Sequence, residues 1–113
     1  MSASYNLVCE QATTFNFQFQ IKNDATPWNL TNYTVEMTVR PYVGAQTSIL
    51  FASNSNGLIA VNGPLGRVTV TVPASTTTNF VPNRYVYDLI FDSGTEVIRV
   101  LEGQFTVTGA VTI

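Results

Sequence analysis

The chain has 113 residues, of which 45% are hydrophobic, and its 5 Lys+Arg and 7 Asp+Glu give a net charge of −2. This length predicts a single domain over residues 1–113 with one substantial core. The basic residues are too few and too scattered to neutralise phosphates, which excludes nucleic-acid binding, and no apolar run approaches the roughly 20 residues that cross a bilayer.

The inventory of reactive side chains is small. The chain has one cysteine, Cys9, and no histidine. Zinc sites and nucleophilic triads draw on these two residue types, so we expect no catalytic residue, no metal and no cofactor. Cys9 follows Val8 in an apolar stretch, which favours a small buried side chain over a reactive thiol. Residues 1–5 lack the features of a secretory signal, so we expect synthesis in a cytoplasm.

Period-two alternation of apolar and polar residues predicts strands with one buried face. The first predicted strand, 15–21, alternates Phe and Ile with Asn and Gln. The second, 33–40, ends before Pro41, which lacks a backbone donor. Two apolar runs, 49–51 and 58–61, then flank an Asn-Gly pair at 56–57, and this pattern predicts a hairpin.

The rest of the chain continues the pattern. Further strands are predicted at 68–72, 84–92, 96–102 and 104–112. Turns are expected at Gly63–Gly66 and Ser93-Gly94, with a bend at Gly103. The irregular segment 74–83 is expected to contain at most one helical turn, with Phe80 closing an end of the core. About eight short strands predict an all-β fold, a single-domain antiparallel β-sandwich that is immunoglobulin-like or similar.

A two-residue loop at Ser93-Gly94 fixes a register in which Asp92 faces Thr95. Asp88 then faces Arg99, and we expect a structural ion pair there. The same register leaves both faces of the hairpin apolar, and the second face consists of Val86, Ile90, Val97 and Leu101. Such a face is usually covered, either by another chain, which makes these residues a predicted interface, or by segment 73–82 of the same chain.

Two further groups of side chains are candidates for chemistry. The acids Asp88, Asp92, Glu96 and Glu102 are poorly placed for a catalytic pair, because acid–base catalysis needs two acids across a cleft. Trp28 lies in a link between strands, where it either stacks on a sugar, together with Tyr5 and Tyr42, or plugs the sandwich edge.

The order of strand and turn motifs resembles a known group of proteins. The motifs are Trp28-Asn29-Leu30-Thr31-Asn32-Tyr33, then Gly66-Arg67-Val68-Thr69-Val70-Thr71-Val72, then Arg84-Tyr85-Val86-Tyr87-Asp88-Leu89, and Arg99-Val100-Leu101-Glu102-Gly103. This order is similar to small β-sandwich structural modules of tailed bacteriophages, found among tail and baseplate proteins of cyanophages and prophages. It is distantly similar to the N-terminal domain of phage baseplate upper proteins.

The resemblance implies a non-enzymatic structural protein of the virion, made in the host cytoplasm, that assembles through contacts with other virion proteins. A tail or baseplate component or a fibre adaptor is favoured, and symmetric assembly predicts a homo-oligomer. Two alternatives stay open: a capsid decoration (cement) protein, and a carbohydrate-binding or host-receptor-binding module. An enzyme is disfavoured by the residue inventory.

Overall fold

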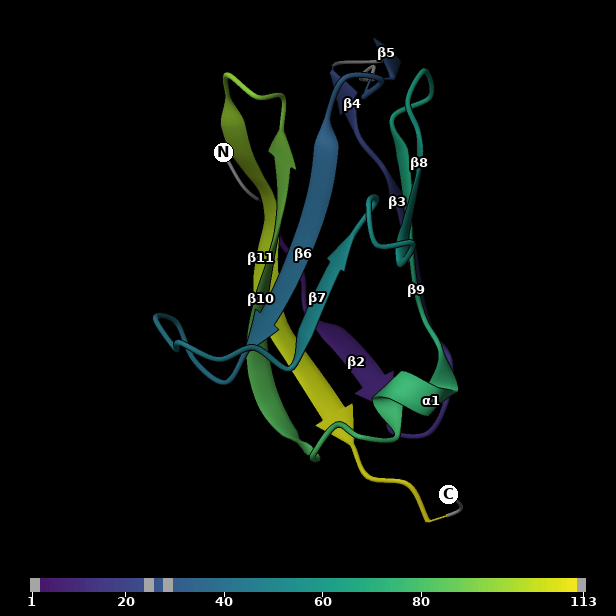
Figure 1. Cartoon of the computed structure of the whole chain (residues 1–113), viewed down its shortest axis with the longest axis vertical. Coiled ribbons are helices and arrows are strands. Elements are labelled where there is room, and N and C mark those ends of the chain that lie inside the picture. Colours follow the sequence, from purple (N-terminus) through teal and green to yellow (C-terminus); the bar gives the residue numbers. More distant parts are fainter. Residues whose placement is uncertain (1–2, 24–25, 28–29, 112–113) are drawn as a thin grey trace.

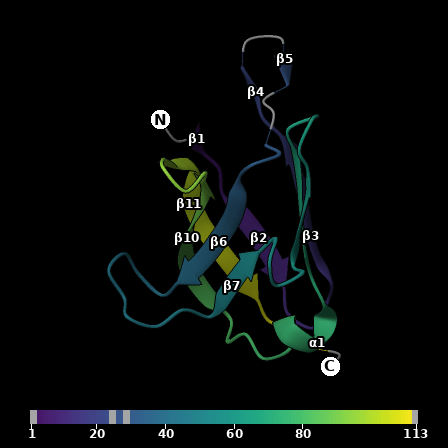
Figure 2. The ribbon, with the colours of Figure 1, turned by 45° about the horizontal axis from the view of Figure 1, so that its top comes forward.

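The computed structural model describes residues 3–23, 26–27 and 30–111, and for 22, 23, 26 and 27 only the backbone. The described chain forms two β-sheets packed face to face, in a body of 43 × 27 × 24 Å. Figures 1 and 2 show the larger sheet on one side and the smaller sheet on the other. The predicted all-β sandwich is confirmed.

The larger sheet has the order β1-β11-β10-β6-β7, and β2 also pairs with β11. Its strands are β1 (Ala3–Ser4), β2 (Leu7–Glu10), β6 (Thr34–Arg40), β7 (Leu50–Ser53), β10 (Asn83–Asp92) and β11 (Val97–Thr108). The two N-terminal strands run parallel to β11, and the other pairs are antiparallel. Sequence periodicity missed β1 and β2 because they have 2 and 4 residues.

The smaller sheet has the order β3-β9-β8. Its strands are β3 (Phe15–Gln20), β8 (Ile59–Asn62) and β9 (Arg67–Val72), and the predicted turn at Gly63–Gly66 joins β8 to β9. A separate ribbon of β4 (Lys22–Asn23) and β5 (Thr26–Pro27) follows β3 at the upper end in Figure 1. The short helix α1 spans Ala74–Thr77.

The core lies between the inner faces of the two sheets. On β6 the predicted alternation is observed, with Val35, Met37 and Val39 fully buried. On β9 the valines 68, 70 and 72 face them from the smaller sheet and are equally buried. The phenyl ring of Phe105 on β11 lies 5.3 Å from that of Phe15 on β3, in an edge-to-face arrangement that joins the two sheets.

The predicted register of the last hairpin is wrong. Asp92 pairs with Val97, so the loop has four residues, 93–96, and not two. The longer loop is favoured because Asp92 Oδ1 accepts a hydrogen bond from Gly94 N at 2.8 Å and Ser93 Oγ accepts one from Glu96 N at 3.1 Å. A bulge next to Leu89 shifts the register again. The two strands predicted at 96–102 and 104–112 are one continuous strand, β11.

The hairpin predicted around Asn56-Gly57 is also wrong. The flanking strands β7 and β8 belong to different sheets, so the connection crosses from one layer to the other. Hydrogen bonds between polar side chains and the backbone hold this connection in a tight turn. Asn56 Oδ1 accepts a hydrogen bond from Ser53 N at 3.0 Å, and Ser53 Oγ accepts one from Asn56 N at 3.2 Å. The Asn-Gly turn is present, but it joins the sheets.

Segment 73–82 closes one end of the core. Phe80 is buried as predicted, with its ring 6.5 Å from that of Phe105. Thr77 Oγ1 donates a 2.7 Å hydrogen bond to Thr13 O, which fixes α1 at the end of the smaller sheet. The segment therefore does not cover the outer face of the final hairpin. The alternative in which residues 73–82 cover that face is wrong.

A groove on the outer face of the larger sheet

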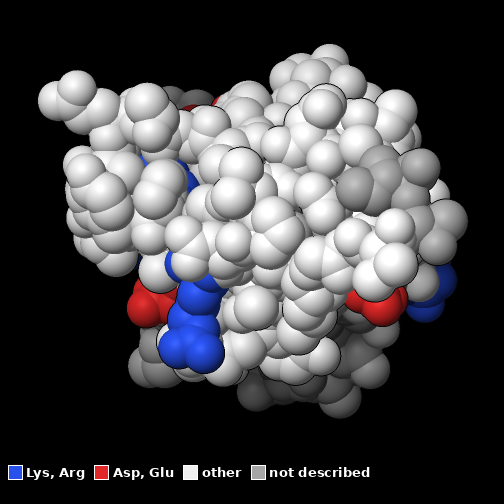
Figure 3. Space-filling view, turned by 90° about the horizontal axis from the view of Figure 1, so that it is seen from below, with Lys and Arg blue, Asp and Glu red and all other residues white. Residues whose placement is uncertain are grey.

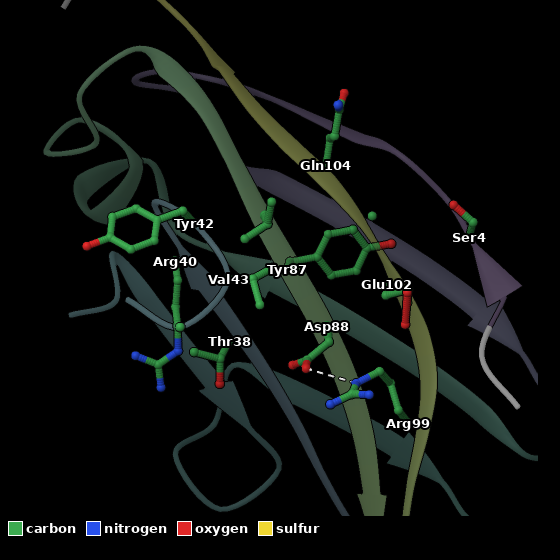
Figure 4. A pocket seen from close by; sticks show the side chains of 13 residues that line it. Ser4, Thr38, Arg40, Tyr42, Val43, Tyr87, Asp88, Arg99, Glu102 and Gln104 are labelled. Atoms are coloured by element: carbon green, nitrogen blue, oxygen red, sulfur yellow. Dashed lines mark hydrogen bonds and ion pairs between the residues drawn. The ribbon is translucent and has the colours of Figure 1, made fainter. Parts of the chain in front are cut away.

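Outer-face side chains of four neighbouring strands form rows across the larger sheet. One row consists of Ser4 on β1, Glu102 on β11, Asp88 on β10 and Thr38 on β6, and the next consists of Gln104, Val86 and Arg40. These rows line a groove of about 580 Å³. Figure 4 shows Tyr42 and Arg40 toward one end and Ser4 and Glu102 toward the other. The groove is thus the place where the strands of this sheet present polar and apolar side chains together.

The groove carries charges of both signs. A chain with only 5 Lys+Arg and 7 Asp+Glu places Arg40, Arg99, Asp88 and Glu102 around it. Arg99 Nε lies 3.1 Å from Asp88 Oδ2, so the expected ion pair is present. The two residues are not direct partners, because Arg99 faces Ile90, and the pair reaches diagonally across the strands. Their side chains are 55% and 38% exposed, and an ion pair in that environment adds little stability.

A turn beside the groove holds two large apolar side chains in water. Arg40 Nη1 donates to Ala45 O at 3.0 Å, and Ala45 N donates to Tyr42 O at 3.1 Å. Gly44 takes a φ of +88°, which suits the third position of a type II turn. Tyr42 and Val43 are left 64% and 87% exposed. The turn is therefore anchored by a hydrogen-bonded arginine while its apolar tip is free.

The four predicted interface residues are not all on one face. Val86 and Ile90 lie half-buried on the outer face of β10, and Val97, opposite Asp92, is 62% exposed near the hairpin loop. Leu101 was placed wrongly: it pairs with the buried Leu89 and packs against the core. The bulge next to Leu89 causes this change, because it shifts the register by one residue and a one-residue shift moves a side chain to the opposite face.

The candidate sugar-stacking residues do not form one platform. Trp28 lies outside the described residues. The ring of Tyr5 stacks on that of Phe17 at 5.6 Å, so it faces the smaller sheet. Tyr42 belongs to the turn beside the groove on the opposite side of the larger sheet. A stacking surface shared by Tyr5 and Tyr42 is therefore absent.

Two titratable side chains of the described chain, Cys9 and Tyr87, are buried in the core. Cys9 is fully buried, as expected, and burial raises the pKa of its thiol to about 11. Burial also raises the pKa of Tyr87 to about 12. Among the residues that the structure describes, three or more His, Cys, Asp or Glu side chains are nowhere grouped to hold a metal ion. In the same part of the chain no helix has the length and hydropathy to cross a membrane.

Sequence reasoning missed the exposed turn at 42–45. Its signal was present in Pro41-Tyr42-Val43-Gly44, where a strand-ending proline is followed by two large apolar residues and a glycine. The anchoring bond from Arg40 had no such signal, because nothing in the local pattern shows which carbonyl an arginine reaches.

Together these features define a class: a small β-sandwich whose outer surface combines apolar side chains, an ion pair and an anchored turn. No family model and no curated protein matches the chain. Among solved structures it is similar to the N-terminal domain of phage TP901-1 ORF48, with a TM-score of 0.55 and 15% sequence identity. The match covers 89% of this chain and 82% of that one. At this level of identity the similarity shows a shared fold.

Proposed function

We propose that the chain is a non-enzymatic structural protein of a tailed-phage virion, a tail or baseplate component or fibre adaptor that assembles through protein contacts. Two observations support this role. The sequence motifs resemble phage tail and baseplate modules, and the fold is similar to a domain encoded by a phage. A capsid decoration protein is the alternative role, and the position of the domain on the particle separates the two.

The observation that carries the proposal is the exposed pair Tyr42 and Val43 on its anchored turn. Large apolar side chains held in a fixed backbone lose little entropy when a partner covers them. Aromatic side chains in such positions are common binding anchors. We therefore assign the interface to the turn 42–45 and the adjoining groove, with Val86 on the groove floor.

The mixed charges at the groove suit a protein partner. Arg99, Asp88 and Glu102 lie close together on the outer face, so a partner needs complementary charges in matching places. Figure 3 shows that charged side chains are sparse on the face seen from below, where most of the surface is uncharged. A nucleic acid is a poor partner for such a surface, because it requires a continuous basic stripe.

The test is cryo-electron microscopy of purified particles of the phage that encodes the chain. We expect ordered density of the domain's size, with the 42–45 turn against a neighbouring protein. Density at the tail end supports the tail or baseplate role, and density on the capsid shell supports decoration instead. A mature particle without this density contradicts the virion role.

Variants locate the interface. Val43→Asp and Val86→Asp are expected to remove the protein from particles while the purified domain keeps its fold. Thr71→Asp, on the exposed outer face of the smaller sheet, is the matched control and is expected to leave incorporation unchanged. If Tyr42 instead stacked on a host glycan, Tyr42→Ala would abolish calorimetric glycan binding and leave incorporation intact.

A further inference from the structure

The core is incompletely covered along β3. The smaller sheet has three strands, and β3 is at its end. Phe15 is buried, whereas Phe17 and Phe19, which face inward with it, are only half-buried. Tyr5, stacked on Phe17, is 53% exposed. A further strand beside β3 would cover these three rings.

The backbone of β3 is available for pairing on this side. In an antiparallel ladder, alternate residues bond one neighbour and the residues between them point the other way. Ile21 N donates to Gly66 O at 2.8 Å, which continues the ladder with β9 through the odd-numbered residues. The N–H and C=O groups of Asn16, Gln18 and Gln20 therefore point away from β9. In the described part of the chain no strand pairs with them.

This edge lacks the usual protection. Natural sheets block free edges with charged residues, prolines or bulges. The sequence of β3, Phe-Asn-Phe-Gln-Phe-Gln, contains none of these, and Ile21 extends the apolar alternation. Such a segment favours pairing with another strand.

We propose that β3 pairs with β3 of a second copy of this chain, antiparallel about a two-fold axis at Gln18. In this register Gln18 lies opposite Gln18, and Asn16 lies opposite Gln20 of the second copy. Phe17 lies opposite Phe19. Each aromatic ring therefore meets an aromatic ring and each amide meets an amide, with no charge in the paired segment. Such matched cross-strand pairs stabilise a sheet.

The pairing joins two three-stranded sheets into one continuous sheet through a self-complementary interface. Because β3 has 6 residues, the buried area falls at the small end of protein interfaces, and we expect a weak dimer. The proposed dimer forms through the β3 edge of the smaller sheet. The proposed virion interface is the groove on the outer face of the larger sheet, so neither proposal depends on the other.

Sedimentation velocity of the purified chain over a wide range of concentration tests the proposal. We expect a monomer–dimer equilibrium that moves to the dimer as concentration rises. Gln18→Pro removes the outward donor, and Gln18→Lys places two like charges at the axis, so both variants are expected to stay monomeric. Ala60→Lys is the matched control, since Ala60 lies in the same row across the sheet, next to Thr69, but on the opposite edge. It is expected to dimerise like the parent.

Hydrogen exchange gives a second readout that needs no variant. The amides of Asn16, Gln18 and Gln20 are expected to gain protection with concentration. A chain that stays monomeric at every concentration overturns the proposal. So does a dimer that survives both Gln18 substitutions in folded protein, or one that Ala60→Lys also disrupts. None of these results bears on incorporation into particles, so the two proposals fail separately.

Discussion

The hydroxyl of Tyr87 on β10 donates a 2.6 Å hydrogen bond to the carbonyl oxygen of Tyr5, which lies beyond the intervening strand β11. The side chain can cross β11 because its direct partner there is Gly103. Tyr5 N also donates to Glu102 O at 2.9 Å, and Gln104 N donates to Asn6 Oδ1 at 3.0 Å. The break between β1 and β2 is thus fixed to the sheet at this glycine.

Gly103→Ala is expected to destabilise the domain strongly. A Cβ at this position would clash with Tyr5 O, a backbone atom that cannot move without breaking the N-terminal pairing. Overpacking of this kind costs about 1–3 kcal/mol. Urea unfolding measures the loss. Gly109→Ala, whose Cβ would lie 3.4 Å from Pro82 Cγ, is the control and is expected to change stability much less. Equal stability of the two variants would contradict the close approach.

Tyr87→Phe is expected to lower the unfolding free energy by about 0.5–1.5 kcal/mol at neutral pH, the usual contribution of one hydrogen bond. It is also expected to change the alkaline stability profile. Burial raises the folded-state pKa of Tyr87 from 10.0 to about 12, so folding favours the protonated phenol. Its contribution is complete below pH 10 and is lost as pH rises toward 12.

The measurement is chemical unfolding as a function of pH for the parent and for Tyr87→Phe. The difference between them is expected to shrink across this alkaline window. Tyr42→Phe, which alters an exposed ring in the turn, is expected to follow the parent curve. If the difference in unfolding free energy stayed constant through this window, the pKa of Tyr87 would be the same in the folded and unfolded chain, which would contradict the prediction.

Cys9 is expected to be inert in the native protein. The side chain is fully buried on β2, and burial raises the pKa of its thiol from 9.0 to about 11, so little thiolate is present at neutral pH. A thiol-specific reagent such as dithionitrobenzoate is expected to react at the rate of unfolding in buffer and rapidly in urea. Fast stoichiometric labelling of the folded chain would contradict this burial.

Arg99→Ala is expected to change the stability of the isolated domain by less than about 1 kcal/mol, because both members of the ion pair with Asp88 are substantially exposed. Thermal unfolding at low and high salt measures this. The double variant with Asp88→Ala provides the thermodynamic cycle for the pair. A coupling energy well above that limit would show that the groove rearranges around the pair.

The strands that the sequence predicted best are those with a long alternation and one buried face. On β6, residues 34–40 alternate through the whole strand, and the structure buries Val35, Met37 and Val39. The final hairpin was predicted less well, since its register depended on a loop of two residues. The hydrogen bonds of Asp92 and Ser93 that lengthen this loop are local, but several turn types compete for the same short sequence.

The surface features were predicted only in part. Val86 and Ile90 were correctly placed on an outer face, while Leu101 moved to the core with the bulge. The crossing between β7 and β8 was missed because an Asn-Gly turn specifies a reversal of the chain and does not specify which sheet the next strand joins. Which sheet a strand joins is decided by long-range packing, and a single sequence does not report it.

The parallel pairing of β2 with β11 also has a consequence for biosynthesis. Leu7 and Cys9 pair with Phe105 and Val107, which lie near the opposite end of the sequence. As the chain leaves the ribosome, β1 and β2 emerge first and have no neighbour in their sheet until β11 has been made. The domain is therefore expected to complete folding only after nearly all of it has been synthesised. Contacts this distant in sequence slow folding, so the nascent chain exposes its N-terminal strands, including the apolar β3 edge, for most of its synthesis.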